Sequence, residues 1–253
     1  MTNPPPSPYD DAFYAAQIEQ SLLGARAYAA RLGEVFKPSS VIDFGCGRGT
    51  WLKAFGETGA QRLVGLDGAW NEGSLVEPGA EYHAVDLASL TPADVPDGPF
   101  DLAMSVEVAE HLPQERSSAF VECLCNAADA VLFGAAIPHQ TGTQHVNLRP
   151  QSAWAREFDD LGYAAWDLFR PAVWGREDVP YWYQQNTFLY VRRNAGLEAH
   201  LAACDVTRID RFDAMDMVHP RLLQAYAGMP AGPSARRLAK LVLPVALVRR
   251  LTR

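Results

Sequence analysis

Short apolar runs recur along the first half of the chain, and most of them end on a glycine or an acidic residue. Each run has the length of a strand, and longer stretches rich in alanine and leucine separate them. The pattern predicts strands at residues 41–44, 62–67, 81–85, 100–106 and 130–137. Because strands and helices alternate, we expect a mainly parallel sheet with helices on both faces.

The remaining elements follow from the same reading. One or two helices are predicted between residue 10 and Pro38, which ends them. Two further strands after the parallel set are expected to form an antiparallel edge. The predicted helices are 50–58, 114–128 and 151–161, and the two late strands are 163–169 and 187–191.

These elements predict a Rossmann-like α/β fold, with a mainly parallel seven-stranded sheet, an N-terminal helical segment and a C-terminal helical tail. Residues 1–37 are expected to form a leader and helices, residues 38–193 the central domain, and residues 194–253 a helical extension. The carboxyl ends of the parallel strands are the expected ligand edge, because open α/β sheets bind ligands there.

Composition narrows the class of protein. A chain of 253 residues with 48% hydrophobic and 21% charged residues has the usage of a soluble globular domain. The net charge of −8 argues against nucleic acid as a partner, because neutralising phosphates requires a basic face. We read the four cysteines as reduced thiols, and the chain shows neither a signal peptide nor a membrane-spanning stretch, so a cytoplasmic location is expected.

A glycine loop follows the first predicted strand. Gly45, Gly47 and Gly49 let the backbone turn sharply and approach a ligand, and the next helix offers free N–H groups. Asp67 stands 22 residues after Gly45, where a carboxylate can bind ribose hydroxyls. Two cofactors fit this pattern, a nicotinamide dinucleotide and S-adenosylmethionine.

The run from Val41 to Gly49, with Asp43 before the loop, resembles the first motif of class I S-adenosylmethionine-dependent methyltransferases. A dinucleotide fingerprint would need glycine near position 50, which is Thr50. The resemblance implies that Asp43 and the loop border the methionine part of the cofactor, that Asp67 binds the ribose, and that Asp86 with Leu87 borders the adenine. The full implied cofactor set is Asp43, Gly45, Cys46, Gly47, Gly49, Asp67, Gly68, Asp86, Leu87 and Glu107.

Glu107, Glu110 and His111 form an ExxEH motif after the fourth strand. If a helical turn begins at Glu107, the three side chains share one face at i, i+3 and i+4. Such a group can hold a divalent cation or provide a general base for a substrate hydroxyl. Both interpretations stay open.

The motif resembles that of ubiquinone-pathway O-methyltransferases and small-RNA 2'-O-methyltransferases, where it is associated with a metal completed by a later histidine. His145 is our candidate for that ligand and His139 the second choice. The metal hypothesis therefore names Glu107, Glu110, His111 and His145 as ligands of Mg²⁺ or Mn²⁺. In the metal-free alternative, His111 or His145 is the base. Glu107, His111 and His145 are the predicted catalytic residues.

The loop after Ile137 and the segment Trp182–Asn186 resemble bacterial methyltransferases of glycan assembly. That resemblance implies O-methylation of a sugar hydroxyl in a glycan or glycosylated small molecule. Aromatic rings suit sugar faces, and the amides of Asn147, Gln184, Gln185 and Asn186 can bind hydroxyls. The alternatives are an O-methyltransferase of a quinone or phenol and a non-catalytic cofactor-binding protein, while an RNA methyltransferase is disfavoured by the acidic charge.

The last twenty residues combine an apolar run at 241–248 with flanking arginine and lysine residues and no acidic residue. A basic amphipathic segment can lie on an anionic membrane surface. The alternative is packing on the protein or on a second subunit, which would make a homodimer.

Overall fold

A computed structural model describes residues 11–71, 73 and 75–227. The described residues belong to two compact units, which divide between Asp216 and Met217. The leader, 1–9, and the basic segment, 234–253, lie outside the described residues, so the membrane and subunit contacts stay predictions. None of the helices within the described ranges has the length and apolar character needed to cross a bilayer.

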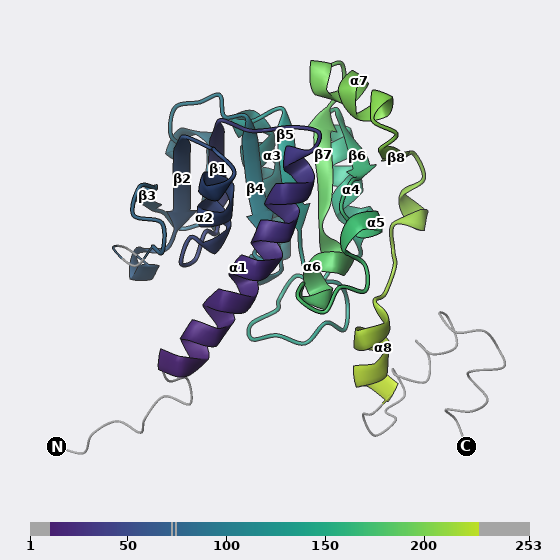
Figure 1. The fold of residues 1–253 in the computed structure, drawn as a ribbon, viewed down its shortest axis with the longest axis horizontal. Helices are drawn as coiled ribbons and strands as arrows, with labels where there is room; N and C mark the ends of the chain where they lie inside the picture. The colour runs from purple at the N-terminus through teal and green to yellow at the C-terminus, as the bar shows by residue number, and fades with distance from the viewer. Residues whose placement is uncertain (1–10, 72, 74, 228–253) are drawn as a thin grey trace. The chain divides into compact units, whose positions relative to one another are not determined.

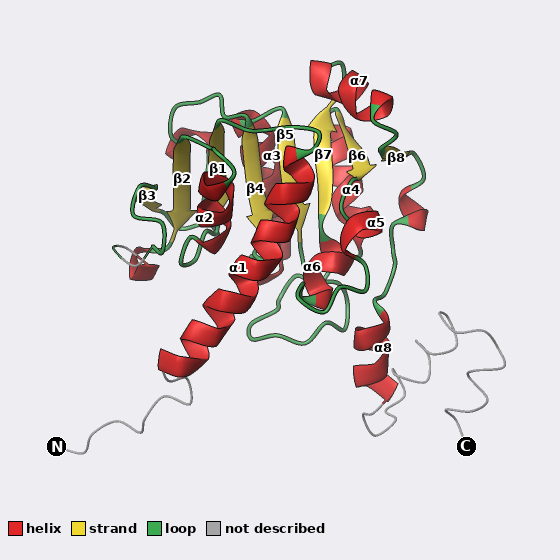
Figure 2. Ribbon diagram, viewed as in Figure 1, coloured by secondary structure: helices red, strands yellow, loops and turns green. Residues whose placement is uncertain are grey.

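The first unit is built on one mixed sheet (Figures 1 and 2). Its strand order is β3-β2-β1-β4-β5-β7-β6-β8, and β3, β2, β1, β4 and β5 are mutually parallel. The strands are β1 (Ser40–Phe44), β2 (Arg62–Asp67), β3 (Glu81–Ala84), β4 (Leu102–Val106), β5 (Ala130–Gly134), β6 (Tyr163–Asp167), β7 (Phe188–Arg192) and β8 (Thr207–Ile209). The predicted class, a Rossmann-like α/β fold, is confirmed.

Helices cover both faces of the sheet (Figure 1). The helices of this unit are α1 (Asp11–Gly33), α2 (Thr50–Glu57), α3 (Ser117–Ala127), α4 (Gln151–Asp160), α5 (Arg170–Val173), α6 (Tyr181–Asn186) and α7 (Gly196–Ala203). The second unit contains α8 (Pro220–Ala227) among its described residues. Helix α1 ends at Gly33, five residues before the predicted stop at Pro38.

Alternation along the strands sends side chains into two hydrophobic cores. Val41 of β1 packs with α1 and α2 residues such as Tyr28 and Phe55, whereas Ile42 packs with Phe120 of α3 on the other face. All five side chains are fully buried or nearly so. Burying one such side chain stabilises the fold by about 1.5–3 kcal/mol, so both helix layers are held by the sheet.

The late strands differ in part from the prediction. β6 and β7 are antiparallel as expected, but β7 lies between β5 and β6, where it continues the sheet. An eighth strand, β8, pairs with β6 in a segment predicted to be helical. Its β-branched residues Thr207 and Ile209 favour a strand, but three residues are too few to show an alternating pattern. The predicted domain boundaries stay predictions; α1 and β8 lie in the same unit as the central sheet.

The strand order places the ligand edge. From β1 the chain moves outward to β2 and β3 and then returns to β4 on the other side of β1. The loops after β1 and β4 therefore leave the sheet in opposite directions, and a crevice opens between them. Gly45 follows β1 and Glu107 follows β4, so these two predicted site residues lie at the same crevice.

Candidate active site

The glycine loop after β1 has a backbone that larger residues would disturb. Gly45 has φ +87°, and a Cβ atom there would lie 2.4 Å from Cγ2 of Val108. The amides of Gly45 and Cys46 both donate to the carbonyl of Leu66, at 2.8 and 3.1 Å, which anchors the turn on β2. The loop therefore approaches the crevice with bare backbone, as a closely bound cofactor requires.

Asp67 organises this loop from the end of β2. Its Oδ2 accepts a hydrogen bond from the Gly47 amide and its Oδ1 accepts one from the Gly68 amide, both at 2.7 Å. Each carboxylate oxygen retains a lone pair for a ribose hydroxyl. Asp43 is buried nearby, and burial, followed by repulsion from Asp67, raises the pKa of its carboxyl group well above the usual range. These residues fit the cofactor that the resemblance implies.

Asp86 lies just beyond β3 and has a local structural role. Its carboxylate accepts hydrogen bonds from the amide of Ala88 at 3.0 Å and the hydroxyl of Ser89 at 2.9 Å. The Val85 amide donates to the Asp67 carbonyl at 2.8 Å, which holds this segment beside the end of β2. The predicted adenine contacts of Asp86 and Leu87 stay predictions.

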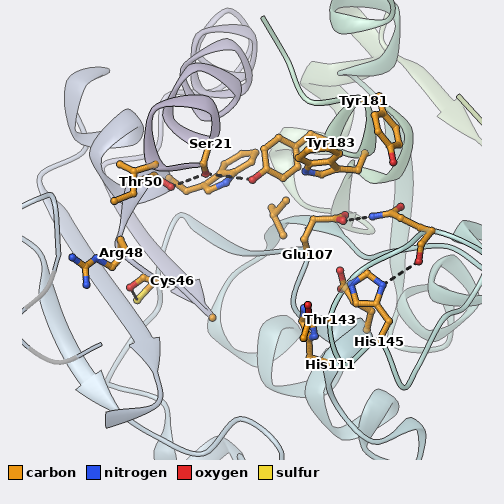
Figure 3. Close-up of a pocket in the computed structure, with 18 of the residues that line it drawn as sticks. Ser21, Cys46, Arg48, Thr50, Glu107, His111, Thr143, His145, Tyr181 and Tyr183 are labelled. Atoms are coloured by element: carbon orange, nitrogen blue, oxygen red, sulfur yellow. Dashed lines mark hydrogen bonds between the residues drawn. The ribbon is translucent and has the colours of Figure 1, made fainter. Parts of the chain in front are cut away.

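A cavity of about 650 Å³ opens beside the glycine loop (Figure 3). The loop borders one side, and the ExxEH motif with His145 borders another. The sequence-predicted residues that line it are Gly45, Cys46, Gly47, Glu107, Glu110, His111 and His145. The other predicted cofactor residues lie outside this lining: Asp43, Gly49, Asp67, Gly68, Asp86 and Leu87.

The predicted helical turn does not begin at Glu107, so the i, i+3, i+4 argument is wrong there. Glu107 has φ +57°, a left-handed conformation uncommon for residues other than glycine. A single 3-10 turn then covers Ala109–His111. The Glu107 carboxylate instead accepts hydrogen bonds from the amides of Gln140 at 2.6 Å and Asn186 at 2.8 Å. Glu107 is therefore outside the group formed by the other predicted ligands.

Glu110, His111 and His145 place one potential ligand atom each within 4.8 Å of one another. The loop after β5 brings His145 there, because the amides of Val146 and Asn147 both donate to the Glu110 carbonyl, at 2.9 and 3.0 Å. Nothing in the sequence encodes that attachment directly. His139, the second candidate, is exposed and is not part of this group.

A backbone carbonyl holds each of the two imidazoles. His111 Nδ1 lies 3.3 Å from the Gln144 carbonyl. His145 Nδ1 lies 3.2 Å from the Gln140 carbonyl, as Figure 3 shows. A carbonyl only accepts, so each Nδ1 carries the proton and each Nε2 keeps a lone pair. Metal-binding histidines are commonly held by a backbone carbonyl in this manner. Oε2 of the buried Glu110 has no hydrogen-bond partner among the described residues, so the three side chains fit a divalent cation.

Burial sets the protonation of the acids. It raises the pKa of Glu110 to about 9, with repulsion from Glu107 as the second cause, and it raises the pKa of Glu107 to about 7. Burial also lowers the pKa of His111. At neutral pH the metal-free pair therefore retains a proton on Glu110, which has the higher pKa, and Glu107 is the carboxyl group that ionises first. The His111 imidazole is neutral and able to accept a proton.

The amides predicted to bind a sugar are used inside the protein. Gln184 is fully buried and binds the backbone of Gly175, Arg176 and Val179. Asn147 donates to the Ala109 carbonyl and to Ser117. Because these amides bind groups of the protein itself, a sugar would have to be bound by other side chains.

Sequence reasoning missed the contribution of α1 to the cavity. Ile18 and Ser21 line it, and the Ser21 hydroxyl lies 2.9 Å from Thr50 Oγ1 and 3.3 Å from the Tyr183 hydroxyl. Close packing at Gly24, where a Cβ would lie 2.9 Å from the Tyr183 ring, brings the helix this near. Alanine-rich helices carry no signal of such a role. Tyr181, Trp182 and Thr143 complete the polar and aromatic part of the lining.

The fold and the site together define a class I S-adenosylmethionine-dependent methyltransferase domain: a mainly parallel sheet with a glycine loop and, at its switch point, an acid that holds that loop. Residues 14–133 match a family model described as a methyltransferase domain. This stretch is 120 of the 253 residues, and together with the fold it identifies an S-adenosylmethionine-dependent methyltransferase domain in the chain. A search of curated proteins gave no match.

Solved structures share this fold at low sequence identity. DesVI of Streptomyces venezuelae is 15% identical, with a TM-score of 0.55 over 72% of this chain and 96% of its own. An O-methyltransferase family protein from Burkholderia thailandensis is 15% identical, with a TM-score of 0.52 over 74% and 60%. Magnesium protoporphyrin IX methyltransferase from Synechocystis PCC 6803, with bound SAH, is 17% identical, with a TM-score of 0.48 over 74% and 90%.

Proposed function

We propose that the protein methylates a hydroxyl oxygen of a sugar, in a glycan or glycosylated small molecule, with assistance from a divalent cation. One observation carries the proposal. A single cavity joins the glycine loop to the cluster of Glu110, His111 and His145, so a methyl donor and a metal-bound or hydrogen-bonded hydroxyl can meet in it.

Different residues bind the cofactor and remove the proton of the acceptor hydroxyl. Bound S-adenosylmethionine supplies a methyl group already activated on a sulfonium, and methyl transfer leaves S-adenosylhomocysteine. Gly45 and Gly47 offer backbone to the cofactor, and Asp67 fixes their loop. Glu110, His111 and His145 would hold Mg²⁺ or Mn²⁺, which supplies a Lewis acid for the acceptor oxygen. Without a cation, His111 Nε2 can take the hydroxyl proton directly, because its Nδ1 is occupied by Gln144.

The lining favours a sugar over an aromatic acceptor. Tyr181 and Trp182 offer ring surfaces, while Thr141 and Thr143 offer hydroxyl groups near the cluster. Carbohydrates present both apolar faces and many hydroxyls, so this mixture matches them. The resemblance to glycan-assembly methyltransferases supports the same choice. The quinone or phenol alternative would require mainly apolar contacts around the ring.

An acceptor panel tests this proposal. We expect oligosaccharides or nucleotide-linked sugars to release S-adenosylhomocysteine and gain one methyl group by mass spectrometry, while catechols and quinols do not. Trp182→Ala should raise the KM of the sugar by roughly tenfold, as expected for losing one stacked ring, and Trp182→Phe should restore most of it. Preferential methylation of phenols would reject the sugar and support the phenolic alternative.

A further inference from the structure

Three buried amides form a chain behind the cavity. Gln185 Nε2 donates to Asn186 Oδ1 at 2.8 Å, and Asn186 Nδ2 donates both to Gln140 Oε1 at 3.0 Å and to Glu107 Oε1 at 2.8 Å. Gln140 Nε2 donates to Glu107 Oε2 at 2.6 Å. The four residues come from the ends of β4 and β5 and from α6, so the chain joins three elements around one carboxylate.

The chain fixes where the Glu107 carboxylate lies. Each oxygen accepts one amide hydrogen, and the backbone of Glu107 has a left-handed conformation. Two amide donors on a half-buried carboxylate make charge-assisted hydrogen bonds, which are strong and directional. One lone pair on each oxygen stays free in a side chain that lines the cavity.

Glu107 lies between the two ends of the transfer path. The side chain of the next residue, Val108, packs directly against Gly45 of the cofactor loop. On the other side, the Glu107 carboxyl group is near enough to that of Glu110, a member of the histidine cluster, for repulsion between them to raise the pKa of Glu110. Glu107 therefore lines the cavity that the cofactor loop and the cluster share.

We propose that Gln140 and Asn186 are positioning residues that hold the Glu107 carboxylate toward the sulfonium of the methyl donor. The inference rests on the proposed function in one respect, the position of the acceptor oxygen at the cluster of Glu110, His111 and His145. An oriented carboxylate attracts the cationic sulfonium, and methyl transfer converts that sulfur into a neutral thioether. The carboxylate thus favours the donor over the product, S-adenosylhomocysteine, and limits product inhibition.

The test compares the affinities for donor and product by calorimetry at pH 8, above the pKa of about 7 of the Glu107 carboxyl group, with chelator present and no acceptor. Gln140→Met removes the amide with little change of shape, and we expect the Kd of S-adenosylmethionine to rise roughly tenfold while that of S-adenosylhomocysteine changes less than about twofold. Glu107→Gln removes the charge itself and should shift the same ratio. In turnover, the KM for S-adenosylmethionine should rise more than kcat falls.

Gln184→Met is the matched control, because Gln184 is an equally buried amide of α6 that binds the backbone and does not contact Glu107. It should lower the melting temperature and leave the affinity ratio unchanged. Equal weakening of both ligands by Gln140→Met and Glu107→Gln, or no weakening, would overturn the inference. Because the measurement contains neither acceptor nor metal, the affinity ratio can be interpreted even if the sugar or the metal proposal fails.

Discussion

Wild-type enzyme stripped of divalent cations is expected to transfer methyl groups roughly a hundredfold more slowly than the Mn²⁺-loaded enzyme. A loss of this size is typical when one group that stabilises a developing oxyanion is removed. The reason is the cluster of Glu110, His111 and His145, whose arrangement fits a cation next to the acceptor oxygen. Affinity for S-adenosylmethionine should change little, because the glycine loop borders another side of the cavity. The measurement is methyl transfer after exhaustive chelation, with each metal added back.

His145→Ala should not recover activity when Mn²⁺ is added, since it removes one of the three ligands. His139→Ala is the matched control: it removes an exposed histidine of the same loop that lies outside the cluster. Recovery in His139→Ala but not in His145→Ala supports the metal site. Full activity in the chelated wild type would reject the metal and leave His111 as the base.

Glu110→Gln is expected to make the metal-free protein more stable than the wild type at pH 8, by an amount that shrinks toward pH 5. Burial raises the pKa of Glu110 to about 9, whereas the ordinary value is 4.5. The folded protein therefore keeps a proton that the unfolded chain releases. The wild type loses stability as pH rises from about 4.5 toward 9, on the order of 1 kcal/mol per pH unit, and glutamine removes this loss.

Thermal unfolding at pH 5 and pH 8 measures the difference. Glu122→Gln, at an exposed glutamate of α3, is the control and should change neither melting temperature. Mn²⁺ should stabilise the wild type by mass action and leave Glu110→Gln unaffected, which narrows the difference between the two proteins at pH 8. A melting-temperature difference that is the same at both pH values would contradict a protonated Glu110.

The parts of the sheet that were predicted correctly are those marked by patterns within a few neighbouring residues. The parallel strands and the glycine loop were readable because apolar runs and glycines mark buried strands and tight turns in any context. β8 was not predicted, because it has only three residues and is stabilised by pairing with β6, which is distant in the sequence. Its short length left no periodicity to detect.

The site was predicted in part, and the errors have a common origin. ExxEH spacing predicted convergence on a helix, but the left-handed backbone at Glu107 breaks that helix before it starts. His145 joins Glu110 and His111 through backbone hydrogen bonds to the Glu110 carbonyl, a tertiary contact that spacing does not encode. The polar residues of the 184–186 segment were assigned to a ligand because sequence does not show which internal groups need partners.

A crystal soaked with Mn²⁺ and S-adenosylhomocysteine, with anomalous data collected at the manganese edge, tests the central claim most directly. The claim is that one cavity holds the cofactor at the glycine loop and a cation at Glu110, His111 and His145. The account predicts cofactor density beside Gly45 and Gly47 and an anomalous peak bonded to those three side chains, with Glu107 still held by Gln140 and Asn186. Cofactor density with no anomalous peak at the cluster, or with Glu107 as a metal ligand, would contradict it.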